Sequence, residues 1–192
     1  MQSQKIAIKQ NFSERQQHSE GRIEIIMGPM FSGKSTELLR RMKRHEIAKK
    51  RVMLVKHTSD DRYVGSDTSV VTHDQKAAKA TLIAKSLKES LLDSKAYEQA
   101  DVIGIDEAQF FGEELPYVAD QIAHHGKTVI CAGLDGDINR NKFGHLIDLI
   151  PMAEKVKKMQ AICVECGTTA SFTHRHTVEV DTQKDEIVIV GG

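Results

Sequence analysis

The stretch Ile23-Glu24-Ile25-Ile26-Met27-Gly28-Pro29-Met30-Phe31-Ser32-Gly33-Lys34-Ser35 decides the fold of this chain. Its mostly apolar, β-branched start predicts a buried strand, and the pattern after it predicts a helix over residues 34–50. Between them, residues 28–35 match the phosphate-binding pattern Gly-x-x-x-x-Gly-Lys-Ser at every defined position. Such a loop binds phosphate oxygens through backbone N–H groups and the N-terminus of the following helix. The sequence therefore predicts a nucleoside triphosphate site.

The loop residues have separate expected roles in binding Mg-ATP. Lys34 should reach the β- and γ-phosphates, and the Ser35 hydroxyl should ligate Mg²⁺. The predicted ATP contacts within the loop are Gly28, Pro29, Met30, Phe31, Ser32, Gly33, Lys34 and Ser35. Phosphate binding follows from this motif, but the reaction does not.

The chain around the loop alternates between strand-like and helix-like segments. Short apolar runs predict further strands at residues 52–56, 102–105 and 128–132, and longer helical patterns cover residues 82–99, 113–125 and 143–157. Apolar strands that alternate with helices indicate a parallel sheet covered on both faces. The predicted fold class is therefore α/β, a doubly wound sheet of the P-loop NTPase type.

Two acids follow the strand predicted at residues 102–105. In phosphate-loop proteins an Asp at this strand end holds Mg²⁺, directly or through water, and Asp106 is the candidate. Glu107 then projects near the γ-phosphate, where a carboxylate can accept a proton from the attacking hydroxyl. Such an acid can activate either water or a substrate alcohol, so ATPase and kinase both stay open. A helicase is excluded, because 192 residues leave no room for a second motor domain.

The last part of the chain is predicted to be a small β-rich unit. It contains Cys163-x-x-Cys166 and then two β-rich runs, residues 177–180 and 187–192, that indicate a hairpin. Taken alone, the cysteine pair fits zinc binding, redox chemistry or a structural role. We expect a polar, disordered leader at residues 1–21, an α/β kinase domain at 22–159 and a lid at 160–192.

Composition narrows the possible partners. Lys plus Arg equals Asp plus Glu, 27 each, and this balance argues against a nucleic-acid partner. No apolar run approaches the ~20 residues that a membrane span needs. The first residues lack the apolar stretch of a signal peptide. Three cysteines make no disulfide framework, and Cys131 lies inside an apolar strand, so a reducing, cytoplasmic location is expected.

Two longer strings carry a family resemblance. Residues 27–38, with Pro-Met-Phe inside the loop, and residues 103–111, with Gln-Phe-Phe after the acids, closely resemble the cytosolic, zinc-containing (type II) thymidine kinases. Weaker similarities are Asp60-Asp61-Arg62-Tyr63, Thr72-His73-Asp74, Leu134-Asp135-Gly136, Phe143-Gly144, and Cys163 and Cys166 followed by Thr173 and Arg175. The similarity runs from about Arg22 to the last residue.

The resemblance implies transfer of the γ-phosphate of Mg-ATP to the 5′-hydroxyl of thymidine, and more weakly of deoxyuridine, in nucleoside salvage. It implies Glu107 as catalytic base, with Lys34 and Arg62 as further catalytic residues. Asp60, Arg62, Asp106 and Gln109 complete the implied ATP site. The implied nucleoside contacts are Met30, Phe110, Leu134, Ile138 and Thr173, with Met30 and Thr173 near the thymine methyl. A lasso, matching Ile187, Val188, Ile189, Val190 and Gly191, is implied to bond the base through main-chain groups.

The sequence departs from the family at two places. Family members continue beyond the double glycine with an aromatic residue and a second pair of Cys or His ligands, so Cys163 and Cys166 supply half of a four-ligand zinc site. The end at Gly192 is therefore expected to be a truncation, with a natural terminus as the alternative. Ile138 stands where the family usually has an aromatic residue near the substrate.

The resemblance finally implies a structural Zn²⁺ in a zinc-ribbon-like lid, a homotetramer, and feedback inhibition by thymidine triphosphate. Thymidine kinase is the leading hypothesis. A stand-alone ATPase and a non-catalytic nucleotide-binding adaptor are the alternatives.

Overall fold

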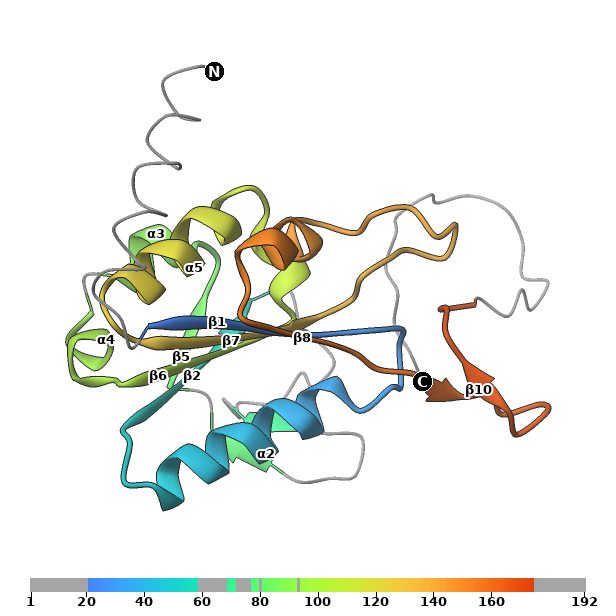
Figure 1. The fold of residues 1–192 in the computed structure, drawn as a ribbon, viewed down its shortest axis with the longest axis horizontal. Coiled ribbons are helices and arrows are strands. Elements are labelled where there is room, and N and C mark those ends of the chain that lie inside the picture. Colours follow the sequence, from blue (N-terminus) through green and yellow to red (C-terminus); the bar gives the residue numbers. More distant parts are fainter. Residues whose placement is uncertain (1–20, 59–68, 72–76, 80, 93, 175–192) are drawn as a thin grey trace.

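The computed structural model describes residues 21–58, 69–71, 77–79, 81–92 and 94–174, and its central element is a six-stranded sheet (Figure 1). The strands lie in the order β5 (Leu82–Ala84), β2 (Val52–His57), β6 (Val102–Asp106), β7 (Thr128–Gly133), β1 (Arg22–Met27) and β8 (Lys155–Lys158). Every neighbouring pair is parallel. The prediction of a parallel α/β sheet is confirmed.

Helices cover both faces of this sheet. The helix α2 (Lys34–Ile47) lies on one face, and α3 (Leu87–Ser90) and α5 (Glu114–His124) lie on the other (Figure 1). The α2 face buries Leu38 and Met42 against Ile26 and Leu54. A larger apolar cluster fills the opposite side, where Leu115 and Ile122 of α5 are fully buried. Burial on both faces explains why the central strands are almost continuously apolar.

The register of the strands brings their carboxyl ends to one edge. Met27 pairs with Gly133, Ile105 pairs with Cys131, and Lys56 pairs with Asp106. The segments that follow β1, β6 and β7 therefore leave the sheet side by side. Functional side chains of parallel sheets gather at this edge.

The helix predicted over residues 82–99 is wrong in part. Residues 82–84 form the edge strand β5, and two short helices follow, α3 and α4 (Lys95–Gln99). Ser86 and Ser94 interrupt the pattern, because each side chain accepts the N–H of the residue three positions later and starts a new helix. The apolar period of this segment comes from three short elements packed on one core.

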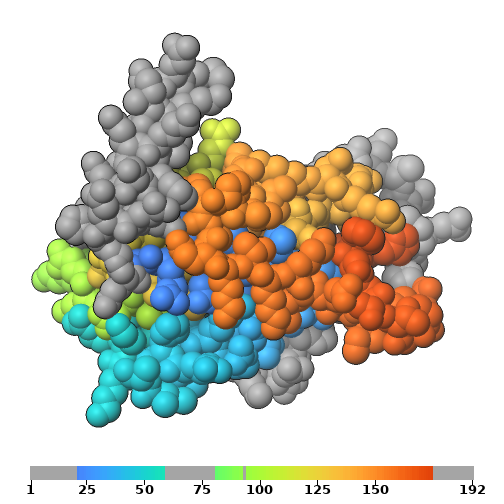
Figure 2. Space-filling view, in the orientation of Figure 1, coloured from blue at the N-terminus to red at the C-terminus, as the bar shows by residue number. Residues whose placement is uncertain are grey.

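The helix predicted over residues 143–157 is also wrong. It is replaced by the 3₁₀ helix η2 (Leu146–Met152) and by β8. Pro151 cannot donate a backbone hydrogen bond, so no regular helix continues through it. Glu154 then pairs with β1, since its N–H donates to the Ile23 carbonyl and its Oε2 accepts the Ile23 N–H at 2.6 Å. Lys155-Val156-Lys157-Lys158 has too many lysines for its sequence to predict a sheet strand. All four residues of this strand are exposed, and the strand lies next to α2 (Figure 2).

Smaller elements complete the described chain. β3 (Ser69–Val71) pairs antiparallel with β4 (Ala77–Lys79), and β9 (Ala161–Ile162) pairs antiparallel with β10 (Thr169–Ala170). The 3₁₀ helix η1 (Ala108–Phe111) directly follows the acids of β6. The predicted leader and the predicted hairpin at residues 177–192 lie outside the described residues, so the domain boundaries stay predictions. None of the helices in the described part is long and apolar enough to cross a bilayer.

Candidate active site

The phosphate loop follows β1 and ends at α2, as predicted. Gly28 has φ 152° and lies so close to the next segment that a Cβ atom there would be 2.5 Å from the Met159 carbonyl oxygen. Only glycine fits this approach. Met159 in turn donates its N–H to the Met27 carbonyl at 2.7 Å. The chain after β8 thus closes over the start of the loop.

Two side chains of the loop, Lys34 and Ser32, could bind a phosphate. The Lys34 ammonium donates to the Pro29 carbonyl at 2.7 Å and so folds back over the loop. Ser32 Oγ is buried, and within the part of the chain that the structure describes it has no hydrogen-bond partner. A buried hydroxyl without a partner is costly unless a ligand supplies one. Phosphate oxygens would satisfy it.

The predicted Mg²⁺ ligands meet beside the loop. Ser35, in the first turn of α2, donates its hydroxyl to Asp106 Oδ1 at 3.0 Å, although 71 residues separate them. Asp106 is 4% exposed at the end of β6. A hydroxyl and a carboxylate are hard oxygen ligands of the kind that Mg²⁺ prefers. The residues present therefore fit a magnesium ion.

The candidate base follows in an unusual backbone conformation. Glu107 has φ 50° and ψ 42°, in the left-handed region that L-residues seldom adopt. Its side chain is nearly buried, and its Oε2 accepts a hydrogen bond from the Gln109 amide nitrogen at 2.6 Å. Gln109 also receives the Leu134 N–H on its Oε1 at 3.0 Å. These contacts join the ends of β6 and β7.

The predicted nucleoside residues lie around the same edge. Phe110 is 39% exposed and meets the Phe143 ring edge-on at 5.9 Å between centroids. Behind it, the His57 ring lies 5.7 Å from Phe110 and 4.7 Å from Phe111, and burial lowers the pKa of His57. His57 is therefore part of an aromatic cluster that supports Phe110.

The chain that follows the cysteine unit, which comprises β9, β10 and the turn with Cys163 and Cys166, returns to the phosphate loop. Thr173 Oγ1 accepts the Met30 N–H at 3.1 Å, so two residues predicted near the same substrate group are in contact. The neighbouring Phe172 lies under the Arg140 guanidinium, 4.4 Å from the ring centroid, and Lys158 lies 5.7 Å away. Cation–π contacts therefore link this segment to the loop after β7.

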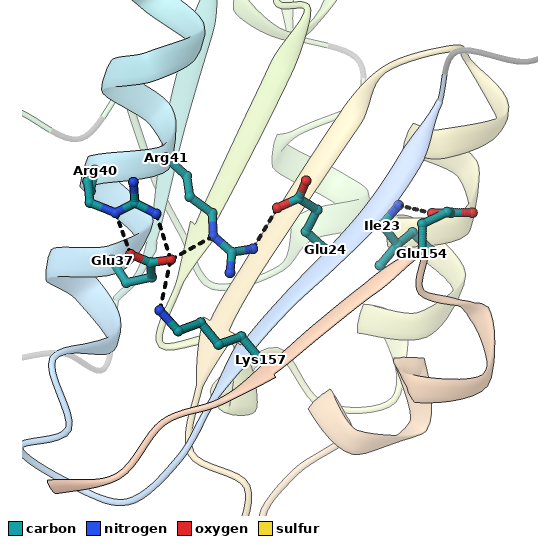
Figure 3. Close-up of polar contacts among 7 residues, drawn as sticks. All are labelled: Ile23, Glu24, Glu37, Arg40, Arg41, Glu154 and Lys157. Carbon is teal, nitrogen blue, oxygen red and sulfur yellow. Dashed lines mark hydrogen bonds and ion pairs between the residues drawn. The ribbon is translucent and has the colours of Figure 1, made fainter.

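The helix that carries Lys34 and Ser35 is fixed by an ion-pair network in which Glu24, Glu37 and Arg41 are buried (Figure 3). Arg41 donates to Glu24 of β1 at 2.6 Å and to Glu37 at 3.1 Å. Arg40 donates to Glu37 at 2.6 Å, and Lys157 of β8 lies 3.3 Å from it. The network joins α2 to β1 and β8, the two strands that flank the loop.

Comparisons with known proteins show the family of this chain. A family model described as thymidine kinase matches residues 21–192. This chain belongs to the thymidine kinase family. The thymidine kinase of Porphyromonas gingivalis (strain ATCC BAA-308 / W83) is 46% identical over 171 residues, 89% of this chain and 78% of that protein. The thymidine kinase of Bacteroides thetaiotaomicron is 48% identical over 85% of this chain and 78% of that protein. The chicken (Gallus gallus) protein called "Thymidine kinase, cytosolic" is 42% identical over 90% and 71%.

The structure brings most of the predicted site residues of this thymidine kinase family member to one edge. The phosphate loop, Asp106, Glu107, Gln109, Phe110, Leu134 and Thr173 lie on segments that start or meet at the carboxyl ends of the strands. Ile138 is 36% exposed in the loop after β7. The predicted residues Asp60 and Arg62 and the lasso residues Ile187, Val188, Ile189, Val190 and Gly191 lie outside the described residues.

The predicted zinc ligands lie on a tight turn between β9 and β10. Cys163 donates its N–H to the Thr168 carbonyl and accepts the Gly167 N–H, both at 2.8 Å. Hydrogen bonds from Thr168 lower the pKa of the Cys166 thiol. Among the residues that the structure describes, no group of three or more His, Cys, Asp or Glu side chains could hold a metal. The turn offers two of the four ligands.

Sequence reasoning missed several contributors. Phe143 was noted in a motif without a role, although it packs on Phe110. Ser32 had no separate role, and its unsatisfied hydroxyl is visible only once burial is known. The ion pairs of Glu37 and Arg41 are not visible in the sequence, because it does not show that Glu24 and Lys157 lie opposite them.

Proposed function

We propose that this chain is an ATP-dependent thymidine kinase that transfers the γ-phosphate of ATP to the 5′-hydroxyl of thymidine. The observation that carries the proposal is the hydrogen bond between Ser35 and Asp106 beside the phosphate loop, with Glu107 next in the chain, within a protein that belongs to this family. Deoxyuridine, which lacks one methyl, should be a weaker substrate, since an apolar wall around a methyl supplies only ~1–3 kcal/mol of discrimination.

In the proposed mechanism the loop N–H groups, Ser32 and Lys34 bind the phosphates of ATP. Glu107 accepts the proton of the 5′-hydroxyl as that oxygen forms its bond to the γ-phosphorus. The bond between the γ-phosphorus and the oxygen that bridges it to the β-phosphate breaks, and ADP leaves with that oxygen. Lys34 holds the charge that develops on the transferred group, and Arg62 is proposed to do the same.

Ser35 and Asp106 are proposed to hold the Mg²⁺ that accompanies ATP. When bound, this ion neutralises charge on the phosphate oxygens. Asp60 is proposed to contact ATP, a role that the family resemblance also implies for Gln109. Met30, Phe110, Leu134, Ile138 and Thr173 are proposed to surround the thymidine, with residues 187–191 closing over the base.

The cysteine pair is proposed to serve structure. A zinc ion held by Cys163 and Cys166 together with two further ligands would fix the turn between β9 and β10 within the lid. We also propose a cytoplasmic homotetramer inhibited by thymidine triphosphate. Gel filtration with light scattering, in the presence and absence of that nucleotide, measures the assembly.

A panel of nucleosides tests the proposed function. The chain is incubated with Mg-ATP and each of thymidine, deoxyuridine, deoxycytidine, deoxyadenosine and deoxyguanosine, and the monophosphates are separated by chromatography. Thymidine monophosphate should dominate. Glu107→Gln should lower kcat by about 10²–10⁴-fold and leave ATP binding unchanged. ATP hydrolysis at one rate with every nucleoside would instead support a stand-alone ATPase, and ATP binding without turnover would support an adaptor.

A further inference from the structure

We propose that Gln109 is a positioning residue that acts through Glu107, and that it links the catalytic base to the wall of the acceptor site. This inference rests on the proposed function. It gives Gln109 a role different from a direct contact with ATP. Three observations support it: the contacts of the amide, the space kept around it, and the backbone conformation of Glu107.

The first observation is the pair of hydrogen bonds at the two ends of the Gln109 amide. Its nitrogen donates to Glu107 Oε2 at 2.6 Å, and its oxygen accepts the Leu134 N–H at 3.0 Å. A carboxylate can only accept, and a backbone N–H can only donate. The amide therefore fits in one orientation, because turning it over would lose both bonds. Gln109 is 3% exposed, so water does not compete for either bond.

The second observation is that two glycines leave room for this residue. A Cβ atom at Gly133 would lie 2.4 Å from Gln109 Oε1. A Cβ atom at Gly144, where φ is +63°, would lie 2.2 Å from the Gln109 carbonyl oxygen. Real Cβ atoms do not approach other atoms so closely. The end of β7 and the Phe143-Gly144 segment therefore both pack directly on Gln109.

The third observation is the left-handed backbone of Glu107. Glu107 lies between β6 and η1, and its φ of 50° is outside the backbone regions of both, although its carbonyl accepts the Phe110 N–H at 3.1 Å. A residue in this conformation depends on its surroundings to hold it. The bond from Gln109 fixes Oε2, which directs the carboxylate relative to β7. Because the same amide holds the Leu134 N–H, the base and this part of the acceptor wall keep a constant spacing.

The first test compares two substitutions of Gln109. Gln109→Met removes both hydrogen bonds and keeps the volume. Gln109→Glu keeps an oxygen that can accept the Leu134 N–H, but it places a second carboxylate against Glu107. This variant therefore tests the hydrogen bond to the base while the hydrogen bond to the backbone is kept. Gln121→Met, on α5, is the matched control and should keep wild-type kcat. Steady-state kinetics give kcat and the KM values for thymidine and ATP, and thermal unfolding monitors the fold.

We expect Gln109→Met to lower kcat by roughly 10- to 100-fold, the effect of losing a hydrogen bond to a charged group. The KM for ATP should stay within about twofold of wild type, since Gln109 is proposed to make no contact with ATP. Gln109→Glu should lose at least as much kcat and still unfold cooperatively, although at a lower temperature, because a second buried carboxylate is repelled by Glu107. An increased KM for ATP with unchanged kcat would make Gln109 an ATP contact and overturn the proposal. Wild-type kcat in Gln109→Glu would overturn it too, even if Gln109→Met failed to fold.

A double-mutant cycle separates positioning from a general structural effect. If Gln109 acts through Glu107, adding Gln109→Met to Glu107→Gln should change kcat by less than about twofold. A full additional loss in the double variant would show an independent role and refute the inference while the kinase activity of the wild type stood. A wild-type chain that forms no thymidine monophosphate would refute the proposed function first, and this inference with it.

Discussion

Replacing Glu37 by Gln tests the ion-pair network that holds α2 against the sheet. Hydrogen bonds from Arg40, Arg41 and Lys157 outweigh the cost of burial, with Arg40 contributing most, and lower the pKa of Glu37 to about 2 from an ordinary value of 4.5. The folded protein therefore binds this proton less tightly than the unfolded chain does. Glu37 stabilises the fold fully above pH 4.5, and this stabilisation is lost as the pH falls towards 2.

The magnitude follows from the two pKa values. Their difference corresponds to about 3 kcal/mol of folding free energy at neutral pH, at about 1.4 kcal/mol per pKa unit. Glu37 is only 7% exposed, but the Arg40 side chain, which contributes most, is 53% exposed, so solvent screens part of this free energy. Since the amide of Glu37→Gln can still accept one hydrogen bond, we expect a loss of about 2–3 kcal/mol at pH 7. For a chain of this length, the unfolding midpoint should fall by about 5–10 °C.

Urea unfolding at two pH values measures the effect. At pH 3.5 the contribution of Glu37 should fall to about 2 kcal/mol, so wild type and variant should approach each other. Glu46→Gln is the matched control on the same helix, because its pair with Lys43 is exposed and should contribute less than about 1 kcal/mol. Equal losses in the two variants, or a Glu37→Gln loss that does not change with pH, would refute the reasoning.

Two further predictions follow from contacts at the cysteine unit and in the core. Thr173→Val removes the acceptor of the Met30 N–H and should raise the KM for thymidine several-fold while the KM for ATP stays constant; equal effects on both values would contradict it. In metal-free protein, iodoacetamide should label Cys166, which is exposed and has a lowered pKa, before Cys131, because burial raises the pKa of Cys131 to about 12. Mass spectrometry of the native protein, with a urea-unfolded sample as control, gives the order, and early labelling of Cys131 would contradict it.

The sequence was informative about the fold wherever one physical effect dominated. The bounds of β6 and β7 were predicted to within one residue, because burial on both faces requires an unbroken apolar run. Residues 82–99 and 143–157 were mispredicted, since their apolar period arises from several short elements. The edge strand β8 was hidden for a different reason. Lysines protect an exposed edge from pairing with another chain, and they also remove the apolar pattern that identifies a strand.

The site was predictable where a motif fixes local geometry, and unpredictable where the geometry depends on register. Ser35 and Asp106 could be joined from sequence, since the carboxyl ends of the parallel strands of one sheet share one edge, although β7 lies between β6 and β1. Gln109 could not be joined to Leu134, because that bond needs β6 and β7 in one register, with glycine at the end of β7. From its motif alone, Gln109 is indistinguishable from an ATP contact.

This register-dependent bond has a consequence for substrate specificity. Leu134 is a predicted wall of the nucleoside site, and its backbone N–H is held by the same amide that holds Glu107. A change that moves the backbone at this position therefore also shifts the base. A side-chain change that leaves the backbone in place does not, because the amide contacts the Leu134 N–H and not its side chain. Side-chain substitutions in the loop after β7 should therefore change nucleoside specificity without changing kcat, whereas changes that move its backbone should alter both.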